Sequence, residues 1–181
     1  HMNRHKAMAS NHQISLFKKI LLFAIFQSTW VATAWMAGNG YEGIAWLPMT
    51  LWAMGMVGVA AHPLLELKTI GCISVLGFIN DTVLIQNGAI TLGHSVSPPW
   101  LIAIWAGFAP TLSWGYTQLQ KRIIFMALLG AFFGYLSYRA GAAFGALQLT
   151  PDLSLPWIAG CWAFAFPACI WIRVWLEQQQ T

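Results

Sequence analysis

Charged side chains are scarce in this sequence. Of its 181 residues only 8% are Asp, Glu, Lys or Arg, whereas 58% are hydrophobic and 11 are Trp. A water-soluble globular protein of this composition would expose large apolar patches, so that class is excluded. The composition indicates a polytopic membrane protein. At about 20 residues per crossing with short loops, the length leaves room for about six helices.

Cysteine and catalytic motifs are also in short supply. Cys72, Cys161 and Cys169 lie in apolar runs with no CxxC spacing, which supports neither a disulfide framework nor a zinc site. The sequence has no HExxH, GxSxG, Walker loop or histidine box, so it predicts no metal site and no cofactor. The formal charge of +4 is better explained by topology signals than by a phosphate-binding patch, so we predict no nucleic-acid partner.

Six apolar runs predict six transmembrane helices. Gly, Pro or Asn stands in most of the breaks between them, where a helix must stop. Strands of a transmembrane barrel would need about ten residues of strict alternation, whereas these runs are apolar on all sides and about twice as long. We therefore predict an all-α fold, a polytopic six-helix transmembrane bundle. The runs are Leu16 to Ala37, Ile44 to Ala61, Leu67 to Ile85, Trp100 to Tyr116, Ile123 to about Ala146, and Leu155 to Leu176.

The predicted organisation is a tag remnant with a cytoplasmic N-terminal segment (1–15), a six-span membrane domain (16–176) and a C-terminal tail (177–181). His1 and Met2 resemble an expression-vector remnant, and the polar N-terminal stretch has no signal-peptide cleavage pattern. The first apolar run is therefore expected to remain in the mature protein.

The basic residues predict the orientation in the membrane. Six alternating crossings place eight of the nine Lys and Arg residues on one side, and only Arg139 falls toward the other. With an even number of crossings, this bias puts both termini in the cytoplasm. Trp residues gather at both predicted interfaces, as expected for aromatic belts. The basic residues on the cytoplasmic side are Arg4, Lys6, Lys18, Lys19, Lys68, Lys121, Arg122 and Arg173.

Of the five acidic residues, only Asp81 falls well inside a long apolar run. An ionisable group at membrane depth is costly and marks a functional-site hypothesis. On a helical wheel Asp81 shares a face with the small residues Ser74 and Gly77, which favour contact with other helices over lipid. We expect Asp81 to point into the bundle, with Asn80 beside it. It is either a functional carboxylate or an interhelical hydrogen-bonding group that only holds the bundle together.

Arg139 lies in the outer part of the fifth run, opposite a stripe of small residues. One alternative is that the stripe packs helix to helix while Arg139 extends to the outer head groups. The other is that both faces are buried and Arg139 forms a partly buried ion pair with Asp81. The stripe consists of Gly130, Gly134, Ser137, Gly141 and Gly145.

Other polar and helix-breaking positions are open to two interpretations. Gln27 lies in the middle of the first run with Trp30 one turn later, which predicts either the floor of a ligand pocket or a hydrogen bond to the third helix. Pro110 and Pro167 each remove a backbone hydrogen bond inside an apolar run and predict kinks. Glu66, at the cytoplasmic surface, is expected in a solvated loop.

Short motifs lie along the first five runs. They are Phe26-Gln27 with Trp30; Leu76-Gly77 with Asp81 and Gly88; Pro98-Pro99-Trp100-Leu101 with Trp105 and Phe108-Ala109; and Leu129-Gly130-Ala131 with Gly134, Ser137-Tyr138 and Ala140-Gly141. This set resembles the bacterial membrane-protein family DUF2878, a domain of unknown function. The family commonly has proline where Tyr135 stands here. The resemblance implies an uncharacterised inner-membrane protein encoded near genes for fatty-acid modification and for light or oxidative stress responses, which points to lipids.

Two classes of function remain. The first, which we favour, is a binding or transport module with an outer-half cavity for a lipid-like or small amphipathic molecule. Within this class, the chain is similar in size and span count to the substrate-binding subunits of vitamin uptake transporters. The second is a membrane-embedded enzyme that modifies an acyl chain or isoprenoid, with Asp81 as general acid or base. The expected partners are membrane lipids and this ligand, and no protein partner is indicated. The predicted ligand-binding residues are Asp81, Arg139, Gln27, Trp30, Asn80 and Tyr138.

Overall fold

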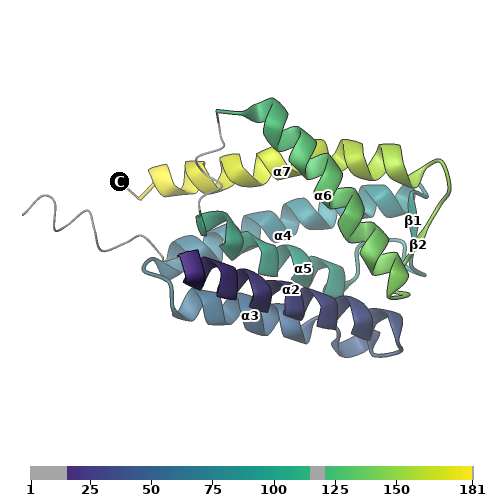
Figure 1. The fold of residues 1–181 in the computed structure, drawn as a ribbon, viewed down its shortest axis with the longest axis horizontal. Helices are drawn as coiled ribbons and strands as arrows, with labels where there is room; N and C mark the ends of the chain where they lie inside the picture. Colours follow the sequence, from purple (N-terminus) through teal and green to yellow (C-terminus); the bar gives the residue numbers. More distant parts are fainter. Residues whose placement is uncertain (1–15, 115–120, 181) are drawn as a thin grey trace, which may run out of the picture.

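The computed structural model describes residues 16–114 and 121–180, which form a helical bundle (Figure 1). The described residues contain six α-helices, and the prediction of an all-α fold is confirmed. Two 3-10 helices, η1 (Glu42–Ile44) and η2 (Ala109–Trp114), and two short strands, β1 (Ile90–Thr91) and β2 (Gln148–Leu149), lie between them. The α-helices are α2 (Leu16–Gly38), α3 (Leu47–Gly58), α4 (Pro63–Gln86), α5 (Pro99–Phe108), α6 (Ile123–Ala143) and α7 (Ser154–Gln178).

Four of the described helices are long and apolar enough to cross a membrane, which makes the chain a multi-pass membrane protein. α3 has 12 residues and α5 has 10. At 1.5 Å per residue they are about 18 Å and 15 Å long, short of the ~30 Å hydrocarbon core. α5 gives way to η2 at Ala109, because the nitrogen of Pro110 has no hydrogen to donate to the carbonyl four residues earlier. α7 continues through Pro167.

The exterior of the bundle is apolar. Large hydrophobic side chains on several helices are exposed, including Phe17 on α2, Val75 on α4, Ile124 on α6 and Phe164 on α7. Such a surface is stable in contact with lipid chains and unstable in contact with water. The four long helices and this apolar exterior both indicate that the bundle is surrounded by lipid.

The most extensive interhelical packing is between α6 and α7, and α6 crosses the other helices obliquely (Figure 1). A Cβ atom added at Gly134 would lie 2.2 Å from Cγ of Trp162 on α7, and one added at Gly130 would lie 2.4 Å from the Trp162 carbonyl oxygen. Only glycine permits this approach, so the predicted packing role is confirmed for these two positions. The Ser137 side chain of the same stripe is exposed.

Two backbone contacts join segments that lie far apart in the sequence. β1 and β2 form a two-residue antiparallel ladder that pairs Ile90 with Leu149 and ties the loop after α4 to the loop after α6. α2 meets α6 at their C-terminal ends, where a Cβ atom on Gly38 would lie 2.0 Å from the Phe144 carbonyl oxygen. Both contacts hold one end of the bundle together through main-chain atoms.

Candidate functional site

Asp81 on α4 is completely buried, and the expectation that it points into the bundle is confirmed. Its Oδ1 accepts hydrogen bonds from the Tyr138 hydroxyl of α6 and, at 3.0 Å, from Nδ2 of Asn80. Its Oδ2 accepts a hydrogen bond from Nε1 of Trp105 on α5 at 2.8 Å. These donors from three helices satisfy a carboxylate that an apolar interior would otherwise leave without partners.

Gly77 makes room for the indole that reaches Asp81. It lies one turn before Asp81 on α4, and a Cβ atom there would lie 2.0 Å from Cγ of Trp105. The Trp105 ring stacks on Trp162 of α7 with centroids 4.6 Å apart and an interplanar angle of 16°. The small-residue face predicted around Asp81 therefore accommodates an aromatic side chain, and through that side chain it links α4 to α5 and α7.

A cavity of about 490 Å³ lies beside this network, bounded by α2, α5, α6 and α7. Its volume falls within the range of about 300 to 1,000 Å³ that is usual for small-molecule sites. Phe23 of α2 and Phe133 and Leu136 of α6 line the cavity and are also exposed, so the cavity opens between these helices onto the apolar exterior. The aromatic residues of the inner walls are Phe26, Trp30, Trp100, Trp105, Phe108, Trp162 and Phe166.

Four side chains with a hydroxyl or amide group line the cavity, namely Gln27, Thr111, Ser137 and Tyr138, and none of its described lining residues is charged. The hydroxyls of Thr111 and Ser137 donate to backbone carbonyls of earlier residues, at 2.7 Å and 2.8 Å. The Tyr138 hydroxyl donates to Asp81. The cavity is therefore an uncharged, mostly apolar space in which three hydroxyl protons are already engaged.

The structure divides the six predicted site residues into three groups. Gln27, Trp30 and Tyr138 line the cavity. Asp81 and Asn80 are buried behind its wall, joined to it through Tyr138. The sixth residue, Arg139, lies elsewhere. The assignment of these residues to ligand binding stays a prediction.

The alternative in which Arg139 pairs with Asp81 is wrong for the described structure. The Arg139 side chain is exposed and lines a second pocket together with Tyr135 and Asp152. None of the ion pairs among the described residues includes Arg139. The reason is helical geometry, because Tyr138 occupies the side of α6 that faces Asp81 and the next residue is rotated by about 100° around the helix axis.

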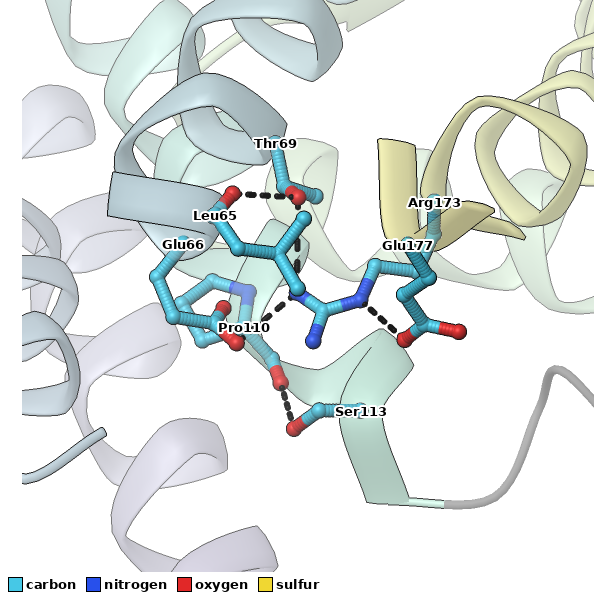
Figure 2. Close-up of polar contacts among 7 residues, drawn as sticks. All are labelled: Leu65, Glu66, Thr69, Pro110, Ser113, Arg173 and Glu177. Atoms are coloured by element: carbon cyan, nitrogen blue, oxygen red, sulfur yellow. Dashed lines mark hydrogen bonds and ion pairs between the residues drawn. The ribbon is translucent and has the colours of Figure 1, made fainter. Parts of the chain in front are cut away.

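A second buried polar cluster joins α4 to α7, and sequence reasoning missed it (Figure 2). Nη1 of Arg173 on α7 donates to Oε1 of Glu66 on α4 at 2.8 Å and to Oγ1 of Thr69 at 3.3 Å. Its Nε donates to Glu177 at 2.7 Å. The side chains of Arg173 and Glu66 are 5% and 8% exposed, so the expected solvated loop at Glu66 is wrong. Oε2 of Glu66 is buried without a hydrogen-bond partner among the described residues.

A third polar contact lies at the end of the bundle where η1 precedes α3. Oε1 of Glu42 lies 2.7 Å from Nε2 of His94 and accepts a hydrogen bond from Nε1 of Trp100 at 3.2 Å. The Glu42 and His94 side chains are both exposed. This contact holds η1 against the loop that leads into α5.

The described residues contain no group of three or more His, Cys, Asp or Glu side chains that could hold a metal ion.

The fold and site together define a helical multi-pass membrane protein with a buried carboxylate network beside an aromatic cavity. Residues 19–168 match the family model DUF2878, described as a protein of unknown function, and the chain belongs to that family. The resemblance inferred from the sequence motifs is thus confirmed. A search of curated proteins and a search of solved structures each found no match to the chain.

Proposed function

We propose that the protein binds a lipid-like or small amphipathic molecule in the cavity between α2, α5, α6 and α7. The observation that carries this proposal is the cavity itself, with its aromatic walls and its mouth on the apolar exterior. An apolar pocket with a few convergent polar groups can hold a hydrocarbon chain and orient its polar end. A mouth between two helices that face lipid would let a membrane-dissolved molecule enter sideways without passing through water.

The proposal places the protein in a bacterial inner membrane with six crossings and both termini in the cytoplasm. The basic residues support this arrangement through the positive-inside rule. α3 and α5 are short, but each has a 3-10 helix next to it, η1 before α3 and η2 after α5, that lengthens the segment. The Arg173 and Glu66 cluster then lies toward the cytoplasm, and Asp81 lies in the outer half of the membrane.

A membrane-embedded enzyme is the second candidate, and the buried Asp81 and Tyr138 contact is the observation in its favour. A general acid or base must come within hydrogen-bond reach of the reacting group. Both carboxylate oxygens of Asp81 are already engaged by donors, and the side chain does not line the cavity. Catalysis would require Tyr138 or Trp105 to release Asp81, so we favour binding.

Filling the cavity tests the binding function. Ser137→Phe puts a large side chain on the cavity wall, and Ser28→Phe is its matched control. Both serines are exposed and donate to a carbonyl four residues earlier, at 2.8 Å and 2.9 Å, but Ser28 does not line the cavity. Lipid extraction and mass spectrometry of each purified protein should show a non-bulk molecule retained by the wild type and by Ser28→Phe. The same molecule should be lost from Ser137→Phe.

Two results would contradict the proposal. One is that the wild type retains nothing beyond the bulk lipids of the membrane. The other is that Ser137→Phe retains the same molecule in the same amount as the wild type. A chemically altered acyl chain after incubation with membrane lipids would instead favour the enzyme.

A further inference from the structure

The second pocket, which contains Arg139, lies where two membrane-length helices meet at one end of the bundle. α6 ends at Ala143 and α7 begins at Ser154, and both helices are long and apolar enough to cross a membrane. The ends of such helices lie at the level of the lipid head groups, because the helices span the hydrocarbon core. The pocket, of about 630 Å³, is therefore in the layer of the membrane that lipid head groups occupy.

This pocket carries one charge of each sign. Its lining includes Arg139 of α6 and Asp152 of the loop between β2 and α7, and both side chains are exposed. None of the ion pairs among residues 16–114 and 121–180 includes either of them, so the two charges do not pair with each other. The other lining residues are uncharged. A ligand that pairs with both charges must carry an anion and a cation.

The two charges are attached at different depths. Arg139 is four residues before the end of α6, which places its backbone about 6 Å from that end at 1.5 Å per residue. Asp152 lies beyond the helix ends, in the loop that leads into α7. The cation is therefore attached nearer to the hydrocarbon core than the anion is. A zwitterionic phospholipid has the matching order, because its phosphate lies nearer to the chains than its ammonium group does.

Apolar side chains continue from the pocket along the lipid-facing surface. Phe132, Leu136 and Arg139 are spaced four and three residues apart on α6, so they share one face of the helix. The Phe132 and Leu136 side chains are exposed. Leu155 of α7 lines the pocket and is also exposed. A lipid whose head group lies in the pocket can pack its chains on this surface.

We propose that the second pocket binds a phospholipid whose head group joins a phosphate to a primary amine, as in phosphatidylethanolamine. Arg139 binds the phosphate, and Asp152 accepts hydrogen bonds from the ammonium group. A guanidinium group can bind a phosphate through two parallel hydrogen bonds, and an ammonium group has three hydrogens to donate to a carboxylate. Phosphatidylcholine has no N–H to donate, and phosphatidylglycerol has no cation for Asp152. The two pockets share no lining residue, so this site is independent of the proposed function of the cavity.

Three lipids with the same palmitoyl and oleoyl chains test this site: phosphatidylethanolamine, phosphatidylcholine and phosphatidylglycerol. Native mass spectrometry of the purified protein, titrated with each lipid in dodecyl maltoside micelles, gives the three dissociation constants. Phosphatidylethanolamine should bind about 3- to 10-fold more tightly than the other two, which is the effect of one charge-assisted hydrogen bond at a partly solvated site. Soluble O-phosphoethanolamine at the concentration of the lipid should not compete, because it lacks the chains that pack on Phe132 and Leu136.

Two variants separate the roles of the two charges. Asp152→Asn should reduce the preference for phosphatidylethanolamine over phosphatidylcholine to less than about twofold, because the charge that receives the ammonium group is gone. Arg139→Gln should weaken the binding of all three lipids, since each carries the phosphate. Arg122→Gln is the matched control, because it removes an exposed cation at the opposite end of α6, outside the pocket, and it should leave lipid binding unchanged. Arg139 and Asp152 are exposed and form no ion pair, so both variants should fold.

Equal binding of the three lipids, or tighter binding of phosphatidylglycerol, would overturn this proposal. A preference for phosphatidylethanolamine that persists in Asp152→Asn would overturn it as well, and so would lipid binding that Arg139→Gln leaves unchanged. Competition by O-phosphoethanolamine at the concentration of the lipid would indicate a site for the free zwitterion and would overturn the lipid assignment. Each of these results leaves the proposed function of the cavity as it stands.

Discussion

The buried contact between Arg173 and Glu66 gives a prediction whose size can be worked from the structure. Arg173→Gln removes the cation from Glu66, which keeps a buried carboxylate with one oxygen already without a partner. Removing one member of a buried ion pair costs about 3 to 5 kcal/mol, because the remaining charge stays desolvated. Glu177 is 39% exposed and lies four residues after Arg173 on the same helix, so Glu177→Gln should cost less than about 1 kcal/mol.

The assay is reversible unfolding in mixed detergent micelles, with the free energy of unfolding taken from the denaturant midpoint. Arg122→Gln removes an equally charged but exposed side chain and serves as the control. The double variant Arg173→Gln with Glu66→Gln should lose less stability than the sum of the two single variants, since the second change removes the stranded carboxylate. A loss for Arg173→Gln no larger than that of Arg122→Gln or Glu177→Gln would show that the pair is effectively solvated, and the reasoning would fail.

Two further predictions concern the carboxylate network and the membrane crossings. Asp81→Asn keeps the shape but turns an NH₂ group toward Trp105 or Tyr138, both of which are donors. The unfolding free energy, measured by the same assay, should therefore fall by about 1 to 3 kcal/mol. Unchanged stability would mean that the carboxylate is not needed to satisfy these donors. If α3 crosses the membrane, a thiol probe should label Asn39→Cys from the periplasm and Ala61→Cys only from the cytoplasm, whereas labelling of both from the periplasm would reduce the number of crossings.

The sequence predicted the long helices well because most residues of each are apolar. It failed where the backbone stops being regular. The fourth run reads as one helix in hydropathy. The hydrogen bond lost at Pro110 was predicted, but the change to the 3-10 helix η2 was not, because the apolar pattern carries no information about it. The two-residue ladder between β1 and β2 was also not predicted, since a pair this short leaves no alternation to detect.

The site was predictable in part. The rarity of an acid in an apolar run and the small residues around it were enough to place Asp81 in the interior. Trp105 was named only among the family motifs and not as a donor to Asp81, because one Trp among 11 in an apolar chain is not distinctive. Arg173 was counted only as one of the basic residues that set the orientation. The sequence did contain a signal for a buried ion pair, since Arg173 stands inside an apolar stretch and Glu177 follows it by one turn.

The ion pair between Glu66 and Arg173 has a consequence for biosynthesis. Glu66 and Arg173 are separated by 107 residues, so at a synthesis rate of roughly 5 to 20 residues per second the acid is made about 5 to 20 s before its partner. During that interval Glu66, in the first turn of α4, has no Arg173 to pair with. Burial of Glu66 as an ion pair must wait for α7, so the synthesis of α7 decides when this end of the bundle closes.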